Sequence, residues 1–311
     1  MTPANTSRTA ALLDARLTAA ALPWGALADE IATLLHDPAV QVPARLVQPL
    51  PGGGSLFVMP ALDARVAISK LITFTPGNAG TGRATIQGDV VVFDVATGER
   101  RLILHGPTVT ARRTAAVSLL AAQRLAPNLT GPLLVVGAGV QGLAHLEAFA
   151  DGLGVREVWV SSRSEASAAR LVQHAQALGL RSQVVSDPNA ALAHCPLTVT
   201  CTPASAVVLT ATPRDDAFVC AVGAFTPNMV ELGPRLCRHM AEVGTVVVDT
   251  PDAQHEAGDL LQAGLAVAGF AALADVVNPQ GAAVQAPVLF KSCGWAGWDL
   301  AAARLALSQE P

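Results

Sequence analysis

The spacing of apolar residues along this chain changes from helical to strand-like and then to a mixed pattern. From Thr9 to about His36, apolar residues recur at helical spacing and Pro23 interrupts them, so two short helices are predicted. Over 44–106, short runs rich in Val, Ile, Leu and Phe alternate with Gly and Pro turns, which predicts a mostly antiparallel sheet. A helical pattern over 110–127 follows and ends at a proline.

From residue 132 onward, predicted strands alternate with predicted helices. The strand "PLLVVGAG" precedes the helical "VQGLAHLEAFADGL", and the alternation continues as far as "TVVVDT" at 245–250. This order is typical of a parallel doubly wound sheet. We therefore predict an α/β fold in which a Rossmann doubly wound domain (113–291) follows an α+β domain (1–112), to which the last helix returns (292–311).

Composition narrows the function classes. With 311 residues, 51% hydrophobic and 14% charged, the chain can bury a large core. A net charge of −4 without a basic tract gives no footprint for nucleic acid or an anionic membrane. No apolar stretch has the length of a membrane span or the form of a signal peptide, so we expect a cytoplasmic protein. The five cysteines, without C-x-x-C pairs or clustered histidines, predict reduced core thiols and no metal site.

The basic residues are strongly biased toward arginine. Of the 20, only Lys70 and Lys291 are lysines. Burial can lower the pKa of an ammonium group, which a guanidinium does not offer. A lysine retained against such a bias is predicted to be chemically required, with chance as the alternative.

The motif G-x-G-x-x-G follows the predicted strand at 132–139 and opens a predicted helix, which is the context that dinucleotide binding needs. Its glycines allow a tight turn, close approach of a pyrophosphate and close helix–strand packing. The predicted cradle consists of Gly137, Ala138, Gly139, Val140, Gln141 and Gly142. The alternative is a Rossmann-like domain that has lost its ligand.

The turn after the second predicted strand selects between the two nicotinamide cofactors. An Asp or Glu there would bind the ribose 2′-hydroxyl of NAD, but this chain has Ser162, Arg163 and Ser164. Hydroxyl groups and a guanidinium suit a 2′-phosphate, so NADPH is predicted to be preferred, with NADH as a second possibility. Alternatively, Arg163 is a solvated residue that stacks on the adenine and accepts either cofactor.

Several segments together resemble one known family. "RTAAVSLLAAQRLA", "GAGVQGLAHLEAF", "AVGAFTPNMVEL", "EAGDLLQAG" and "LFKSCGWAGWDLAAARL" are similar to the ornithine cyclodeaminase/mu-crystallin family along nearly the whole chain, and most of all to its bacterial Δ1-pyrroline-2-carboxylate/Δ1-piperideine-2-carboxylate reductases. The resemblance implies NAD(P)H-dependent reduction of these cyclic imines to L-proline and L-pipecolate. It also implies a homodimer whose first domain binds the small imino-acid substrate and forms the subunit contact.

The resemblance also assigns site residues. Arg45, Lys70 and Arg113 match the positions that hold the substrate carboxylate, and a guanidinium fork suits such a group. Lys70 is the candidate catalytic residue, which keeps the imine in register and manages the proton; Arg113 suits substrate and cofactor alike. Further cofactor contacts are expected at Thr200, Cys201, Thr202, Val222, Gly223 and Ser292.

Departures from the family pattern are also informative. Phe225 stands where cyclodeaminases carry an aspartate, so ornithine cyclisation is not expected, and the ring is predicted to contact the nicotinamide or the substrate. Asp89, where many relatives have threonine, is either a proton donor or a turn carboxylate. His145 is predicted to be a packed helix residue. The rival functions are an alanine dehydrogenase-like or N-alkyl amino-acid dehydrogenase and a mu-crystallin-like binding protein without useful turnover.

Overall fold

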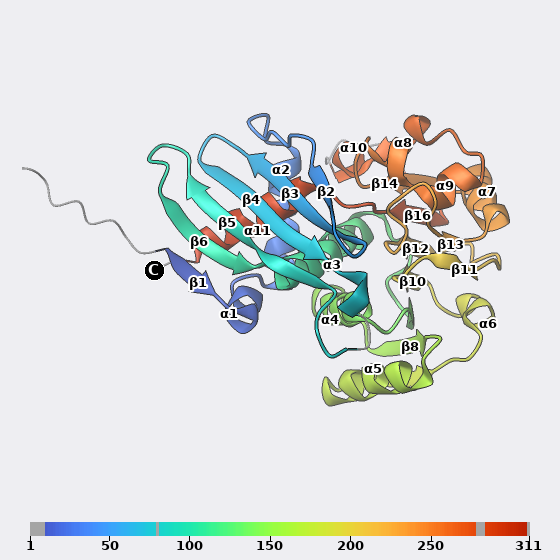
Figure 1. The fold of residues 1–311 in the computed structure, drawn as a ribbon. Coiled ribbons are helices and arrows are strands. Elements are labelled where there is room, and N and C mark those ends of the chain that lie inside the picture. Colours follow the sequence, from blue (N-terminus) through green and yellow to red (C-terminus); the bar gives the residue numbers. More distant parts are fainter. Residues whose placement is uncertain (1–9, 79–80, 278–283, 310–311) are drawn as a thin grey trace, which may run out of the picture. The chain divides into compact units, whose positions relative to one another are not determined.

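A computed structural model describes residues 10–78, 81–277 and 284–309 (Figure 1). The chain divides into two compact units. Unit 1 comprises Met1–Arg113 and Trp295–Pro311, and unit 2 comprises Thr114–Gly294. The boundary between them falls within the long helix α3, Gly106–Leu125.

Unit 1 is built on a six-stranded sheet in the order β1-β6-β5-β4-β3-β2. All neighbouring strands pair antiparallel except β1 and β6, which are parallel. The strands are β1 (Ala11–Leu13), β2 (Leu46–Leu50), β3 (Gly54–Leu62), β4 (Val66–Phe74), β5 (Ile86–Asp94) and β6 (Arg100–His105), with a 3₁₀ turn at η1 (Pro76–Asn78). The predicted antiparallel sheet is confirmed.

The alternation of buried and more exposed residues along β4 shows which face of this sheet is buried. Val66, Ile68 and Lys70 are buried while the residues between them are half-exposed, as the period of a strand requires. Helices α2 (Trp24–Leu35) and α11 (Ala296–Ser308) cover the buried face, and they lie behind the sheet in Figure 1. The chain therefore returns its last helix to unit 1, directly over the strand that carries Lys70.

The first predicted helix is partly wrong. Ala11–Leu13 form strand β1 and pair with Leu102–Leu104 of β6, and the helix α1 begins only at Ala15. The open edge of β6 offers a long-range partner, which overrides a short helical pattern. Thr9 lies outside the described residues. The break at Pro23 is confirmed, since this proline separates α1 (Ala15–Ala20) from α2.

Unit 2 contains an eight-stranded parallel sheet in the order β15-β14-β16-β12-β10-β7-β8-β9. Its strands are β7 (Leu133–Val136), β8 (Glu157–Ser161), β9 (Arg181–Val184), β10 (Leu197–Thr200), β12 (Phe218–Ala221), β14 (Thr245–Val248), β15 (Ala271–Ala272) and β16 (Val288–Lys291). The remaining elements are α4 (Val140–Gly152), α5 (Glu165–Ala177), α6 (Pro188–Leu192), β11 (Ser205–Leu209), β13 (Val230–Leu232), α7 (Pro234–Val243), α8 (Ala253–Glu256), α9 (Gly258–Gln262), η2 (Val267–Gly269) and α10 (Leu273–Val277).

The strand order reverses between β7 and β10, which is the topological switch point of a doubly wound sheet. All four residues of β7 are buried, because a parallel sheet is covered on both faces. The α/β Rossmann prediction is confirmed. The sequence did not predict β16 as a strand, although it lies between β12 and β14.

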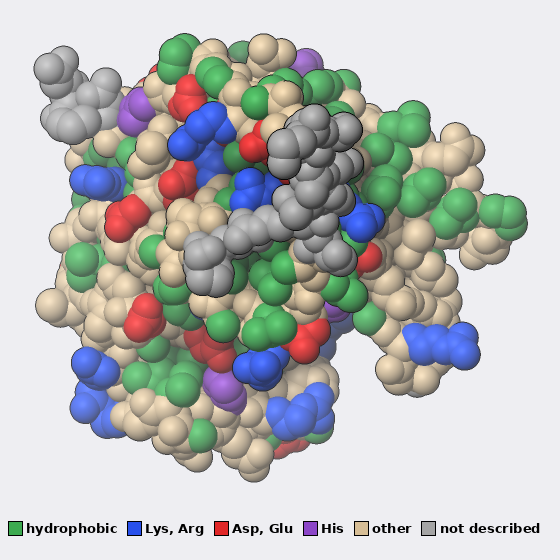
Figure 2. Space-filling model, turned by 90° about the vertical axis from the view of Figure 1, so that its left-hand side faces the viewer, with side chains coloured by type: hydrophobic (Ala, Val, Ile, Leu, Met, Phe, Trp, Pro, Cys, Tyr) green, Lys and Arg blue, Asp and Glu red, His purple; other side chains and the backbone are tan. Residues whose placement is uncertain are grey.

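Four further properties of the described residues bear on function: membrane-spanning helices, metal-binding clusters, cysteines and surface charge. None of their helices combines the length and apolar character needed to span a membrane. No group of three or more His, Cys, Asp or Glu among them is arranged to hold a metal ion. The five cysteines are free thiols. On the face drawn in Figure 2, acidic and basic side chains are interspersed among neutral ones.

Candidate active site

A buried cluster of three charged side chains lies in unit 1. Lys70 Nζ of β4 is 3.0 Å from Asp299 Oδ1 of α11, and Arg113 Nε of α3 is 3.4 Å from the same oxygen. Lys70 and Asp299 are essentially inaccessible, and Arg113 is 7% exposed. The structure thus brings together two of the three predicted carboxylate-binding residues and adds an aspartate that the sequence reasoning missed.

The electrostatics of this cluster suit a second anion. Burial is the main cause that lowers the pKa of Lys70 to about 8; Asp299 opposes that shift, and Arg113 adds to it. With Lys70 protonated, two cations surround one carboxylate, so the cluster carries a net positive charge. Arg113 Nε and Asp299 Oδ2 have no hydrogen-bond partner among the described residues. A carboxylate ligand would neutralise that charge.

Arg45 is exposed and immediately precedes β2. Leu46 pairs with Val58, and Lys70 pairs with Met59 on the other side of β3. If the pairing of β2 with β3 is extended by one residue before Leu46, Arg45 stands opposite Met59, which in turn pairs with Lys70. Arg45 then lies on the same face of the sheet as Lys70. Arg45 is therefore placed at the rim of the face that carries the cluster.

The glycine motif of unit 2 has the geometry that a dinucleotide requires. Gly137 follows β7 with φ +117°, and a Cβ there would meet Cys201 O at 2.6 Å. A Cβ on Gly142 would lie 2.0 Å from Gly137 O, so only glycine allows α4 to pack this closely. Gly139 is the N-cap of α4 without a side-chain cap, and a Cβ there would face open space. Open space at an uncapped helix N-terminus fits a pyrophosphate.

This geometry predicts opposite outcomes for two glycine substitutions. Gly139→Ala should leave the free energy of unfolding nearly unchanged but weaken NADPH about tenfold or more, because its methyl group occupies the space for the phosphates. Gly142→Ala should destabilise the protein by about 1–3 kcal/mol through overpacking. Urea unfolding without cofactor and NADPH fluorescence titration measure the two effects. Unchanged NADPH affinity in Gly139→Ala would contradict the assignment of this cradle.

The turn after β8 presents the residues predicted to select the cofactor. Ser162 is half-buried, and Arg163 and Ser164 are exposed. Ser164 caps α5 by accepting a hydrogen bond from Ser167 N at 3.2 Å, and Ser162 Oγ accepts from Ser164 N at 3.3 Å. These bonds order the turn and leave the Arg163 guanidinium at the surface.

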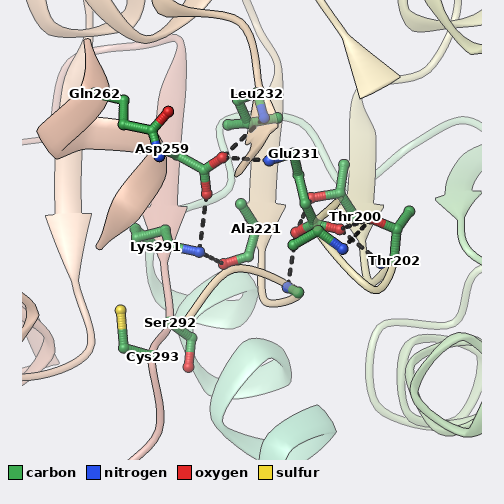
Figure 3. A network of polar contacts seen from close by, with 12 residues as sticks. Thr200, Thr202, Ala221, Glu231, Leu232, Asp259, Gln262, Lys291, Ser292 and Cys293 are labelled. Atoms are coloured by element: carbon green, nitrogen blue, oxygen red, sulfur yellow. Dashed lines mark hydrogen bonds and ion pairs between the residues drawn. The ribbon is translucent and has the colours of Figure 1, made fainter. Parts of the chain in front are cut away.

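One buried carboxylate holds the loops that follow β10 and β12 (Figure 3). Glu231 accepts hydrogen bonds from Thr200 Oγ1 at 2.9 Å, from Thr202 N at 2.6 Å and Thr202 Oγ1 at 2.9 Å, and from Gly223 N at 2.7 Å. Three of the predicted cofactor contacts are therefore fixed by a residue that the sequence reasoning missed. Among the other predicted contacts, Cys201 directs its thiol to Gly137 O at 3.3 Å, and Val222 N donates to Thr200 O at 2.9 Å.

Lys291 has a structural place in the same network. Its Nζ pairs with Asp259 Oδ2 at 3.0 Å and donates to Ala221 O at 3.2 Å, while Asp259 Oδ1 accepts from Glu231 N (Figure 3). The predicted cofactor contact Ser292 is 3% exposed and donates to Asp249 Oδ2 at 2.9 Å. The side chains of Lys291 and Ser292 are therefore both held by hydrogen bonds and ion pairs inside unit 2, at the end of β16.

The structure separates the remaining candidates by exposure. Phe225 is 46% exposed in the loop after β12 and is available to a ligand. His145 is fully buried on α4, where it bonds Gln141 O and Ser118 Oγ, and burial lowers its pKa to about 4. Its prediction as a packed helix residue is confirmed. Asp89 lies within β5 rather than in a turn, and the strand period directs it to the sheet face opposite Lys70.

These features define a protein with a Rossmann dinucleotide cradle in one unit and a buried cationic cluster in the other. The chain belongs to the ornithine cyclodeaminase/mu-crystallin family, whose model matches residues 24–309. It is 39% identical to Delta(1)-pyrroline-2-carboxylate reductase 1 of Burkholderia multivorans over 304 residues, covering 95% of this chain and 94% of that protein.

Two further proteins extend the comparison. The chain is 38% identical over 299 residues to the Delta(1)-pyrroline-2-carboxylate/Delta(1)-piperideine-2-carboxylate reductase of Azospirillum brasilense, covering 95% of this chain and 94% of that protein. Among solved structures, Thermococcus litoralis Delta(1)-pyrroline-2-carboxylate reductase in complex with NADH and L-proline matches with a TM-score of 0.82 at 21% identity, covering 95% of this chain and 93% of the other. The structural match supports the fold.

Proposed function

We propose that this chain is an NADPH-dependent reductase of cyclic imine carboxylates. It converts Δ1-pyrroline-2-carboxylate to L-proline and Δ1-piperideine-2-carboxylate to L-pipecolate. The observation that carries the proposal is the buried cluster of Lys70, Arg113 and Asp299, whose net positive charge matches a carboxylate substrate. Two relatives, which are 38–39% identical to this chain over nearly its whole length, are named as reductases of these imines.

In this reaction the residues of unit 1 chiefly bind and orient. Lys70 and Arg113 hold the substrate carboxylate, with Arg45 at the rim, which fixes the face of the planar imine that is presented. A nicotinamide cofactor held at the glycine cradle would supply a hydride to C2 of an imine that binds already protonated, and the C=N π electrons would become the nitrogen lone pair. Little further acid–base chemistry is required, and catalysis rests on positioning and electrostatics.

The choice of NADPH over NADH rests on Arg163. Arg163→Ala should weaken NADPH by roughly one to two decades and NADH much less, because a charge-assisted hydrogen bond is worth roughly 1.5–3 kcal/mol. Fluorescence titration with each cofactor measures both affinities. Arg170, another exposed arginine, lies on the following helix, so Arg170→Ala is the matched control. Equal losses of NADPH and NADH in Arg163→Ala would show that this side chain does not bind the 2′-phosphate.

A substrate panel separates this function from its rivals. We expect NADPH oxidation with both imines, because one ring methylene is worth only about 1–3 kcal/mol in a pocket. Efficient turnover of pyruvate with ammonia or an alkylamine, and not of the cyclic imines, would favour an amino-acid dehydrogenase instead. Tight NADPH binding without oxidation by any of these substrates would favour a binding protein of the mu-crystallin kind.

The proposal includes a homodimer formed through unit 1. The sheet face opposite α11 carries apolar side chains that are unusually exposed, with Leu12 at 69%, Leu46 at 57% and Leu71 at 41%. The registers of β2, β3 and β4 place Leu46, Val58 and Leu71 side by side on this face. An exposed apolar surface of this kind suits a second copy of the chain. Sedimentation of wild-type protein and of Leu46→Glu tests the assembly.

A further inference from the structure

Asp299 is the least expected member of the cluster, because the buried residues of α11 are apolar apart from Asp299 itself and Arg304. Its carboxylate lies in the first turn of that helix, where the helix dipole favours a negative charge. Oδ1 contacts both Lys70 and Arg113, whereas Oδ2 is buried without a hydrogen-bond partner among the described residues. A fully buried carboxylate that stabilised the fold alone would be expected to use both oxygens.

We infer that Asp299 is a positioning residue for the proposed reaction: it holds Lys70 beside Arg113 and keeps Lys70 in the protonated form that binds a carboxylate substrate. This inference rests on the proposed function. Without a negative charge between them, two buried cations would repel each other, and Lys70 would lose its proton more readily. Asp299 thus allows a cationic site to persist in the interior of unit 1.

No other charged group among the described residues acts strongly on Lys70. Its neighbours on β3 and β5 are the apolar Met59 and Val90. From the packed helices, Asp299 of α11 favours the ammonium form, and Arg113 of α3 opposes it. Asp299 is therefore the only one of these groups that raises the pKa of Lys70, while burial and Arg113 lower it to about 8.

Protonation of Lys70 and binding of a carboxylate ligand should therefore depend on each other. A carboxylate ligand binds the cluster with Lys70 protonated, so affinity should be constant below about pH 8 and fall up to tenfold per pH unit above it. In Asp299→Asn the pKa of Lys70 falls, and the loss of affinity should begin roughly 1–3 pH units lower. At low pH this variant should bind at least as tightly as wild type, because its protonated cluster carries one more positive charge. Purely structural damage would instead weaken binding at every pH.

The experiment measures the dissociation constant of pyrrole-2-carboxylate, without NADPH turnover, between about pH 5 and 10. This planar ring carboxylate stays ionised over the range and has no basic nitrogen, so the titration reports the protein. Asp63→Asn is the matched control, since Asp63 is also a buried carboxylate of unit 1 paired with a cation, Arg304, outside the cluster. Its onset should match that of wild type.

Asp299→Glu keeps the charge and provides the second test should Asp299→Asn not fold. Its onset should stay near that of wild type even where affinity is lower. An unshifted onset in Asp299→Asn, equal weakening at all pH values, a lowered onset in Asp299→Glu, or no pyrrole-2-carboxylate binding by wild type would each overturn the inference. The proposed function fails separately, if wild-type protein does not reduce the imine.

Discussion

Lys70→Met is expected to lower kcat/KM for Δ1-pyrroline-2-carboxylate by about three decades. The variant loses an ammonium–carboxylate hydrogen bond worth roughly 1.5–3 kcal/mol. It also removes the nearer of the two cations that the described residues place beside Asp299, so Arg113 is left facing that carboxylate and the cluster no longer carries a net positive charge for the substrate carboxylate. Together these effects amount to about 4 kcal/mol, or a thousandfold. Steady-state kinetics on protein shown to be folded by circular dichroism measures the loss.

The other lysine of the chain supplies the control. Lys291 is equally buried and pairs with Asp259 at the same distance, 3.0 Å, but in unit 2. Lys70→Met and Lys291→Met should each lower the free energy of unfolding by about 3–5 kcal/mol, because each removes the nearest cation from a buried aspartate. Only Lys70→Met should raise the KM for the imine sharply. Parallel losses of stability and activity in both variants would show that Lys70 has a structural role alone.

Arg113→Leu is expected to lower kcat/KM for the imine by about two to three decades. The guanidinium offers a fork to the substrate carboxylate, and a charge-assisted pair with two such bonds is worth roughly 3–4 kcal/mol. Asp299 keeps Lys70 as its partner, so stability should fall less than in Lys70→Met. Kinetics with the imine varied, together with an NADPH titration, decides between the two roles that suit Arg113. A large loss of NADPH affinity with an unchanged imine KM would assign this residue to the cofactor.

The adjacent Arg112 is a natural comparison. Its guanidinium stacks on Trp24 at 3.7 Å, and its Nε donates to Leu22 O at 2.7 Å, so it ties α3 to the N-terminal helices. Arg112→Leu should destabilise unit 1 and leave the imine KM within about threefold of wild type, because the guanidinium lies against Trp24 and Leu22 O. Comparable rises of the imine KM in both variants would contradict the specific role of Arg113.

The sequence was most informative where a local pattern carries the constraint. The glycines of the cradle, the buried run of β7 and the helix that follows are adjacent in the chain, so their spacing alone predicted the turn. Lys70 continues the buried series Val66 and Ile68 of β4, so its burial follows from strand alternation. In both places a short-range rule and the final fold agree.

The missed features depend on contacts between distant segments. β16 enters the sheet between β12 and β14, an order that no local pattern encodes. Asp299 and Glu231 act on residues 229 and 31 positions away, and neither stands in a recognised motif. Their signal was nevertheless present, because each is a lone carboxylate in an apolar stretch, and a carboxylate is buried only with partners.

The product that wild-type protein forms from NADPH and Δ1-pyrroline-2-carboxylate tests the proposed function most directly. We expect L-proline, identified by chiral chromatography, in amounts equal to the NADPH oxidised. Wild-type protein with L-ornithine and NAD is expected to release no ammonia, because Phe225 stands where the family resemblance places the aspartate of cyclodeaminases. Proline and ammonia from ornithine, with no reduction of the imine, would contradict the proposed reductase activity and indicate a cyclodeaminase.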